Sequence, residues 1–269
     1  MITITYVTVT YNAASVLQRT LDSVLCQDYD QIEHLIIDGG STDGTMQLVD
    51  DYITRSNAAN NGHSIQVTSE PDHGIYDAMN KGLRSATGDY ICFLNAGDTL
   101  PLPTTVSNIV ETIQKSQSTE STHETSNIKH QTINYSVLYG DTDITDAEGR
   151  FLCHRRLSPP EHLTWRSFRN GMLVCHQAFY ARTDFAVATP FDTRYRFSAD
   201  VDWCIRIMRQ ADRENIPMLN LHAVVADYME QGATTRNHRA SLWERFHIMR
   251  RHYGLLTTVI MHAWFIIRK

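Results

Sequence analysis

The stretch SIQVTSEPDHGIYDAMNKGLRSATGDYICFLNAGD, residues 64–98, decides the fold that we expect for this chain. It begins and ends with short apolar and β-branched runs, which are typical of strands. Between these runs, residues 74–86 carry an apolar stripe at helical spacing, formed by Ile75, Met79, Leu83 and Ala86. A strand, a helix and a second strand in this order predict one unit of a parallel sheet.

The residues on either side repeat this alternation. Residues 2–11 (ITITYVTVTY) and 32–40 (IEHLIIDGG) predict two further strands. Residues 15–27, 41–53 and 103–115 predict three further helices. We therefore expect an α/β fold with a Rossmann-like, mostly parallel central sheet and helices on both faces.

Polar residues follow each expected strand at its carboxyl end, which is where open parallel sheets bind their ligands. The four endings are Tyr11-Asn12, Asp38-Gly39-Gly40, Glu70-Pro71-Asp72 and the segment from Asn95 to Asp98. If the sheet forms, all four endings face one rim, so we expect a binding site there.

The second half of the chain has a different pattern. The polar, Ser/Thr-rich residues 116–134 predict a flexible loop between residues 1–115 and residues 135–235, which are expected to be two halves of one domain. Residues 135–144 and 150–157 flank TDAEG and predict a hairpin. A long C-terminal helix is expected from about Ala240, within residues 236–269.

That C-terminal segment is rich in arginine and tryptophan. A basic amphipathic helix of this kind can lie on an anionic membrane. Packing against the main domain or against a second subunit explains the same pattern equally well. We therefore keep peripheral membrane contact and homo-oligomerisation as alternatives.

Composition limits the classes of function. The net charge of −6 gives no indication of nucleic-acid binding. The 5 cysteines contain no CxxC pair and predict free thiols in a reducing cytosol. The first residues lack the basic start and continuous apolar region of a signal peptide, and residues 255–267 are shorter than the roughly 20 apolar residues that cross a bilayer. We expect a cytoplasmic protein, with the inner face of the cytoplasmic membrane as an alternative location.

Several common catalytic motifs are absent from the sequence. The first strand is followed neither by GxGxxG nor by GxxxxGK[ST], which argues against a dinucleotide dehydrogenase and a P-loop kinase. No GxSxG nucleophile elbow and no zinc-type spacing of His and Cys occurs.

The rim itself offers candidate ligand-binding residues. Asp38 leaves a β-branched run and enters a Gly-Gly turn, where its carboxylate suits the N–H of a base or the hydroxyls of a ribose. Asp43 is better explained as a helix cap. Asp72, Asn80 and Lys81 are expected to face a polar ligand at the same rim, although a solvated helix face explains Lys81 about as well.

Two further acids are candidates for chemistry. Asp98 follows a buried-looking strand. Hard divalent cations such as Mg²⁺ or Mn²⁺ are commonly bound by carboxylate oxygens together with the phosphate oxygens of a substrate. Asp200 lies in the first turn of a predicted helix, at the edge of its apolar face, and is our candidate base. Asp202 is expected on the solvent side of that helix. His176 and Gln177 are placed on a short strand, where a structural role for the histidine is equally favoured.

Together these segments resemble family 2 glycosyltransferases with the GT-A fold, and most closely the bacterial polysaccharide type that includes colanic-acid and O-antigen enzymes. The matching pieces run in family order from Val7 to Arg206, and the part from Glu70 to Asp98 is the most specific. They are VTVTYNAA, LIIDGGSTDGT, SEPDHGIYDAMNKGLRSATGDYICFLNAGD, LYGD, CHQAFY and RFSADVDWCIR.

The resemblance implies inverting transfer of a sugar from a nucleotide donor, most often UDP-linked, to a hydroxyl of a glycan or lipid-linked glycan in cell-surface polysaccharide synthesis. Residues 1–115 would then form the nucleotide-sugar-binding half, with Thr10, Tyr11 and Asp38 lining the nucleoside site, and residues 135–235 the metal and acceptor half. Asp98 stands at the last position of the family's DXD metal motif, and Asp200 at the aspartate of its "ED" base motif. His176 and Gln177 fall in the acceptor region.

The sequence departs from the family pattern in three ways. The metal motif is reduced to the single Asp98, with Asn95 three residues earlier, Ala199 stands where the base motif usually has Glu, and Gly39 stands where many relatives have an acid. Because of these departures, other functions remain as alternatives. A glycoside hydrolase, a sugar nucleotidyltransferase and a non-catalytic sugar-nucleotide or glycan-binding module are the rival hypotheses.

Overall fold

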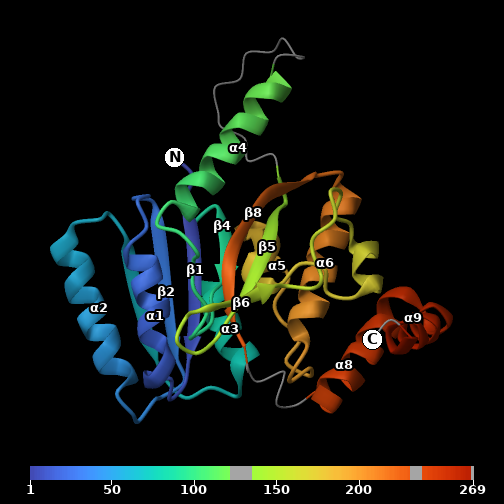
Figure 1. Ribbon diagram of the computed structural model, residues 1–269, viewed down its shortest axis with the longest axis horizontal. Coiled ribbons are helices and arrows are strands. Elements are labelled where there is room, and N and C mark those ends of the chain that lie inside the picture. The colour runs from blue at the N-terminus through green and yellow to red at the C-terminus, as the bar shows by residue number, and fades with distance from the viewer. Residues whose placement is uncertain (122–134, 231–237, 268–269) are drawn as a thin grey trace.

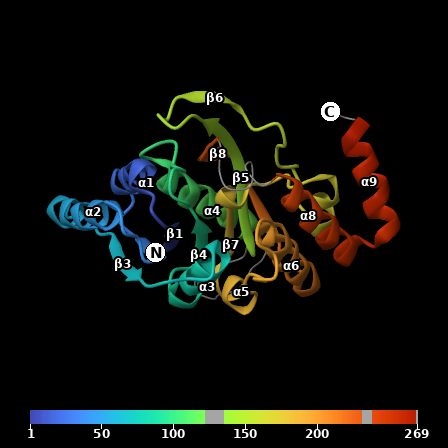
Figure 2. The same ribbon diagram turned by 90° about the horizontal axis from the view of Figure 1, so that it is seen from below.

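The computed structural model describes residues 1–121, 135–230 and 238–267. Its strands form one 8-stranded sheet of order β3-β2-β1-β4-β7-β5-β6, in which β8 also pairs with β5 (Figures 1 and 2). The strands are β1 (Ile4–Thr10), β2 (Ile32–Asp38), β3 (Ser64–Ser69), β4 (Tyr90–Phe93), β5 (Val137–Thr145), β6 (Phe151–His154), β7 (Phe179–Arg182) and β8 (Met218–Met229).

Helices cover both faces of this sheet. The α-helices are α1 (Ala14–Leu25), α2 (Thr45–Ala59), α3 (Ile75–Ser85), α4 (Thr105–Ser121), α5 (Thr183–Ala188), α6 (Ala199–Glu214), α8 (His238–Tyr253) and α9 (Leu255–Ile267). The described residues also form two 3₁₀ helices, η1 (Trp165–Asn170) and η2 (His176–Ala178). α1 and α2 pack on the face that presents Ile36, whereas α3 packs on the face that presents Val7.

The expected α/β fold with a mostly parallel sheet is confirmed. β1 pairs in parallel with both β2 and β4, β2 pairs in parallel with β3, and β5 pairs in parallel with β8. β7 runs antiparallel between β4 and β5, and the predicted hairpin is the antiparallel pair of β5 and β6.

The register of the first strands brings their ends together. Thr10 of β1 is the cross-strand partner of Asp38 of β2, and Asp38 is the partner of Ser69 of β3. The Leu94 N–H continues the ladder to the Val7 carbonyl, so the segment that follows β4 reaches the same rim. The predicted convergence of the strand ends is therefore present.

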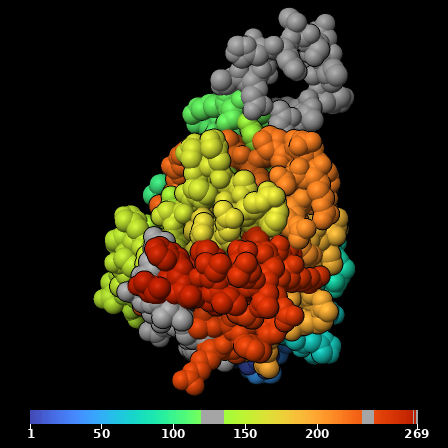
Figure 3. Space-filling model, turned by 90° about the vertical axis from the view of Figure 1, so that its right-hand side faces the viewer, coloured from blue at the N-terminus to red at the C-terminus, as the bar shows by residue number. Residues whose placement is uncertain are grey.

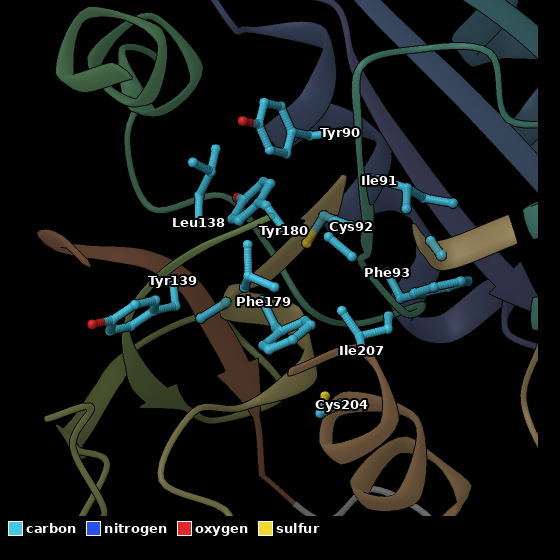
Figure 4. Packing of buried hydrophobic residues seen from close by; sticks show 14 of the residues in the cluster. Tyr90, Ile91, Cys92, Phe93, Leu138, Tyr139, Phe179, Tyr180, Cys204 and Ile207 are labelled. Carbon is cyan, nitrogen blue, oxygen red and sulfur yellow. The ribbon is translucent and has the colours of Figure 1, made fainter. Parts of the chain in front are cut away.

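The larger hydrophobic cluster extends from β1, β2 and α3 through β4 and β7 to α6, and a smaller one lies under α1 and α2. Figure 4 shows Cys92 and Phe93 of β4 and Phe179 of β7 beside Cys204 and Ile207 of α6. The fully buried Trp203 ring stacks on Phe191 at 4.8 Å and meets Phe93 edge-on at 5.6 Å. This packing fixes the start of α6 relative to the end of β4.

Three boundaries differ from the expectation. α4 continues to Ser121, so the first part of the predicted 116–134 loop is helical, and the remainder lies outside the described residues. α2 begins at Thr45 rather than at residue 41, since the preceding residues form the turn around Asp38. The C-terminal helix is two helices, because Gly254 breaks it with a φ of +82°.

Gly82 sets how closely α3 approaches β1. A Cβ at this position would lie 2.4 Å from Val7 Cγ1, which is well inside van der Waals contact. We expect Gly82→Ala to lower the free energy of unfolding by about 1–3 kcal/mol in urea titrations, although alanine alone favours the helix by roughly 1 kcal/mol.

Gly44 offers a matched control for this substitution. Its φ is −75°, and an added Cβ would lie 3.7 Å from the Ala14 Cβ, an ordinary contact. Gly44→Ala should therefore match or slightly exceed wild-type stability. Equal stability of the two alanine variants would contradict the close packing of α3 on β1.

Candidate functional site

A pocket of about 340 Å³ opens at the rim where the strand ends converge. Its lining includes six of the side chains expected at the site: Thr10, Tyr11, Asp98, His176, Gln177 and Asp200. A second pocket of about 340 Å³ lies beside the C-terminal end of α6 and contains none of them. The rim pocket is therefore the candidate active site.

Asp98 is held inside the pocket wall. Its side chain is 4% exposed. Gln177 Nε2 donates to one carboxylate oxygen at 2.8 Å, and the Met229 N–H donates to the other at 2.9 Å. Burial raises the pKa of Asp98 to about 6, and the two hydrogen bonds offset only part of this effect. The turn that delivers Asp98 requires Gly97, whose φ is +100° and whose missing Cβ leaves space for Met229.

Asp200 lies in the first turn of α6 and accepts two hydrogen bonds. The Tyr76 hydroxyl donates at 3.0 Å, and His176 Nδ1 lies 3.2 Å from the second carboxylate oxygen. Burial acts to raise the pKa of Asp200, but the hydrogen bond and charge of His176, with the charge of Arg245, outweigh it and lower that pKa. Asp200 is therefore an ionised, oriented carboxylate at neutral pH.

The short helix η2 connects both acids. His176 lies between Asp200 and Asn95, whose amide nitrogen is 3.0 Å from His176 Nε2. The next residue, Gln177, holds Asp98. The expectation of a strand at this dipeptide is wrong, because the 3₁₀ turn places both side chains on the pocket and β7 begins only at Phe179.

Several buried oxygen atoms in this pocket lack a hydrogen-bond partner within the described residues. They are Thr10 Oγ1, Asn95 Oδ1 and Gln177 Oε1. Together with the Asp98 carboxylate they offer the neutral and anionic oxygen ligands that Mg²⁺ and Mn²⁺ prefer. No group of three or more His, Cys, Asp or Glu side chains suited to a metal occurs in the described parts of the chain. The residues therefore fit a hard cation that takes its remaining ligands from a bound phosphate.

Of the predicted nucleoside residues, Thr10 and Tyr11 line the pocket, whereas Asp38 lies beside Thr10 on the next strand. Asp38 is fully buried and accepts hydrogen bonds from the N–H groups of Gly40 and Ser41 and from the hydroxyls of Ser41 and Ser69. Burial acts to raise the pKa of Asp38, and these four donors outweigh it and lower that pKa. In this conformation Asp38 shapes the loop at the strand end.

Tyr11 and Asp72 meet over Gly39. A Cβ on Gly39 would lie 2.5 Å from Asp72 Oδ2 and 3.3 Å from Tyr11 Cδ2, so a larger residue there would require the Asp72 side chain to move. The Tyr11 ring is 64% exposed and lines the pocket, so it is available to a ligand.

Asn80 and Lys81 are not brought into the pocket. The Asn80 amide bonds both backbone groups of Phe191, which ties α3 to the core aromatic cluster. Lys81 Nζ pairs with Glu70 at 2.9 Å and donates to the Pro71 carbonyl, so it ties α3 to the segment that follows β3. Asp43 caps as expected, since it accepts the Thr45 and Ala14 N–H groups.

The expected solvent position of Asp202 is wrong. Its side chain is fully buried, where Arg206 Nε lies 2.6 Å and His252 Nε2 2.7 Å from the carboxylate oxygens. α8, which carries His252, covers this side of α6. The helical pattern of α6 alone gave no sign of that cover.

Sequence reasoning also missed part of the pocket wall. Tyr76, Arg196, Phe197 and Met229 all line the pocket. Tyr76 belongs to the same DHGIYDAMNKG stretch as the other rim residues, which was the available signal. Met229 reaches Asp98 through the pairing of β5 with β8, a contact between distant segments that no local pattern predicts.

Comparison with known proteins supports one family. A sequence model of glycosyl transferase family 2 matches residues 5–179. The PGL/p-HBAD biosynthesis glycosyltransferase of Mycobacterium bovis (strain BCG / Pasteur 1173P2) is 32% identical over 228 residues, which cover 83% of this chain and 75% of that protein.

Solved structures show the same fold at low identity. S. aureus TarS 1–349 in complex with UDP-GlcNAc has a TM-score of 0.66 at 15% identity, over 92% of this chain and 64% of that chain. The Pyrobaculum calidifontis mannosyltransferase PcManGT, in complex with GDP-Man and Mn2+, has a TM-score of 0.62 at 18% identity, over 96% and 69%. The chain covers only 43% of the longer TarS structure. These neighbours share the expected GT-A arrangement of sheet and helices.

The burial of Asp98 predicts a pH-dependent cost to stability. The pKa of Asp98 is about 6 in the folded protein, against an ordinary value of 3.8. Between these two pH values the folded state binds the proton more tightly than the unfolded chain does, so the free energy of unfolding falls as the pH rises from 3.8 to about 6. We expect Asp98→Asn to raise the free energy of unfolding of the metal-free protein at pH 8, by up to ~3 kcal/mol.

The gain should be smaller at pH 5 than at pH 8 in urea titrations. An asparagine can keep both contacts, since its amide can donate to the unpartnered Gln177 Oε1 after a flip of that side chain. A variant that is less stable than wild type at pH 8 would show that the ionised form is well accommodated.

Proposed function

The chain belongs to glycosyl transferase family 2, and on this premise we propose that it is an inverting glycosyltransferase using a nucleotide-sugar donor, with UDP as the nucleotide. The acceptor is a hydroxyl of a glycan or lipid-linked glycan in cell-surface polysaccharide synthesis. One observation carries the proposal: Asp98 and Asp200 line the same pocket while η2 holds each of them through a different side chain.

The donor nucleotide is assigned to the side of the pocket formed by the first strands. The exposed Tyr11 ring can stack on the base, and Asp72 lies beside it over Gly39. Asp38 shapes the loop beneath them through its bonds to residues 40 and 41. The complexes of TarS with UDP-GlcNAc and of PcManGT with GDP-Man support a nucleotide-sugar as the donor class.

Asp98 is assigned to the diphosphate side. Asp98, with Asn95 Oδ1 and Gln177 Oε1 beside it, is proposed to hold Mn²⁺ or Mg²⁺. A divalent cation bound there neutralises the charge that develops on the leaving diphosphate. Complexes of related folds with Mn2+ support this assignment.

Asp200 is assigned as the general base. It is ionised, and its two oxygens are oriented by Tyr76 and His176. As the acceptor oxygen forms its bond to the sugar C1, its proton passes to the Asp200 carboxylate and the bond from C1 to the diphosphate oxygen breaks. Attack from the face opposite the leaving group inverts C1.

Asp98→Asn tests the proposed metal site in a variant that we expect to be at least as stable as the wild type. A thermal-shift screen of UDP-, GDP-, TDP- and CMP-sugars should show the largest shift with a UDP-sugar, and Mn²⁺ should add to it relative to EDTA. The Mn²⁺ increment should vanish in Asp98→Asn, because the anionic ligand is gone. An equal Mn²⁺ increment in both proteins would remove Asp98 from the metal site.

Asp200→Asn tests the base. We expect transfer to fall by about 10²–10⁴-fold, the usual range for loss of a general base, while UDP affinity stays within about twofold in calorimetry. Asp202→Asn, on the same helix, is the matched control: it should lower the unfolding midpoint but keep transfer per folded molecule. Equal loss of nucleotide affinity and transfer in Asp200→Asn would count against the base role.

A further inference from the structure

The helix α9 presents its apolar residues to solvent and its more polar residues to the protein. Leu256, Ile260 and Ile267 are 76%, 55% and 76% exposed. On the opposite side, Thr258 is fully buried and the His262 ring lies 5.1 Å from Phe246 of α8. We call the outer side the α9 face; it consists of Leu255, Leu256, Val259, Ile260, Ala263, Trp264 and Ile267.

This distribution reverses the usual one. A surface helix of a globular domain turns its apolar stripe to the core, and the spacing of the α9 face follows a helical period along one side. Figure 3 shows α8 and α9 as one red band across this side of the molecule. A contiguous exposed apolar face of this kind marks an interaction surface.

The surroundings of the α9 face are positively charged. α9 has no charged residue between Leu255 and Ile267, and η1, which packs against it, carries Arg166 and Arg169 without an acid. α8 carries four arginines against the single acid Glu244. Arg239 and Arg250 are exposed, whereas Arg251 pairs with Asp192 at 3.4 Å and the charge of Arg245 acts on Asp200 in the pocket. This positive region belongs to a chain whose net charge is −6, so the charge is concentrated locally.

We propose that the α9 face, with the arginines of α8 and η1 beside it, binds the surface of an anionic lipid bilayer. Aliphatic side chains with a tryptophan between them suit the boundary of headgroups and acyl chains, and arginines suit anionic headgroups. No helix among the described residues is long and apolar enough to cross a membrane, which fits a helix lying in the interface plane.

A second copy of the chain suits this face less well. A two-fold symmetric interface sets the same patch against itself. The arginines around the α9 face would then meet arginines, with Glu244 as the one acid of α8 and already bonded to the Arg196 and Phe197 N–H groups. Charge complementarity therefore selects an anionic surface.

Membrane binding has a consequence for the acceptor that rests on the proposed function. Arg196 and Phe197 line the pocket, and Glu244 of α8 holds both of their N–H groups at 2.8 Å. The helix pair that contacts lipid thus also carries one wall of the site. This link favours an acceptor whose lipid part stays in the membrane.

Vesicle flotation tests the proposal with the purified full chain. Vesicles of phosphatidylcholine alone are compared with vesicles containing about one third phosphatidylglycerol, at low and high NaCl. We expect at least tenfold tighter binding to the anionic vesicles, weakened severalfold by salt. Leu256→Gln combined with Ile260→Gln should weaken binding at least tenfold, since burial of each aliphatic side chain is lost.

Leu102→Gln is the matched control, since Leu102 is 54% exposed and precedes α4, far along the chain from α9. It should bind vesicles as wild type does, and all variants should keep the unfolding midpoint and the UDP-induced thermal shift. Vesicle binding without a UDP shift would sink the proposed function alone. Wild-type binding by the double variant, no preference for anionic vesicles, or a dimer in light scattering that the double variant abolishes would overturn the membrane proposal.

Discussion

The pocket depends on the hydrogen bonds of one short helix, η2. His176 and Gln177 are consecutive, yet one holds the acid at the start of α6 and the other holds the acid after β4. The two side chains can reach different acids because consecutive side chains of a 3₁₀ helix point in different directions. η2 is itself anchored by β7, which runs between β4 and β5 in the sheet. The chemistry of the site is thus tied to the most buried part of the fold.

The two acids differ because their surroundings differ. Both are buried, but the hydrogen bonds to Asp98 come from an amide and a backbone N–H, whereas those to Asp200 come from a histidine and a tyrosine hydroxyl. The charges of His176 and Arg19 also act on Asp98, yet burial outweighs them there. The pKa of the first is raised and that of the second is lowered. An acid with a raised pKa is stabilised in its ionised form when a cation binds to it, whereas an acid with a lowered pKa is already ionised at neutral pH. This contrast suits a cation ligand and a base in one pocket.

The first half of the fold could be predicted because local signals were sufficient there. The alternation of β-branched runs and helical stripes predicted β1 to β4 and α1 to α3, and the strand endings predicted the rim. Asp98 and Asp200 could be chosen as candidates because Asp98 follows an apolar strand and Asp200 lies in the first turn of α6, at the edge of its apolar face, and both line the pocket. Asp202 was misplaced because its burial comes from α8, about 50 residues later, through His252. Asn80 was misplaced because its amide serves the Phe191 backbone, a contact that only tertiary structure provides.

The position of α8 also bears on how the sequence of this protein can change in evolution. Ser241 contacts Ser198 just before α6, and Glu244 caps the neighbouring pocket wall, while the opposite side of the same helix pair is exposed. Under the proposed membrane binding, a substitution in α8 would act on lipid contact and on the pocket wall at once. Lineages that adapt to a new envelope composition would then change the proposed acceptor side in the same step, whereas the proposed donor side, built on β1 to β3, can stay constant.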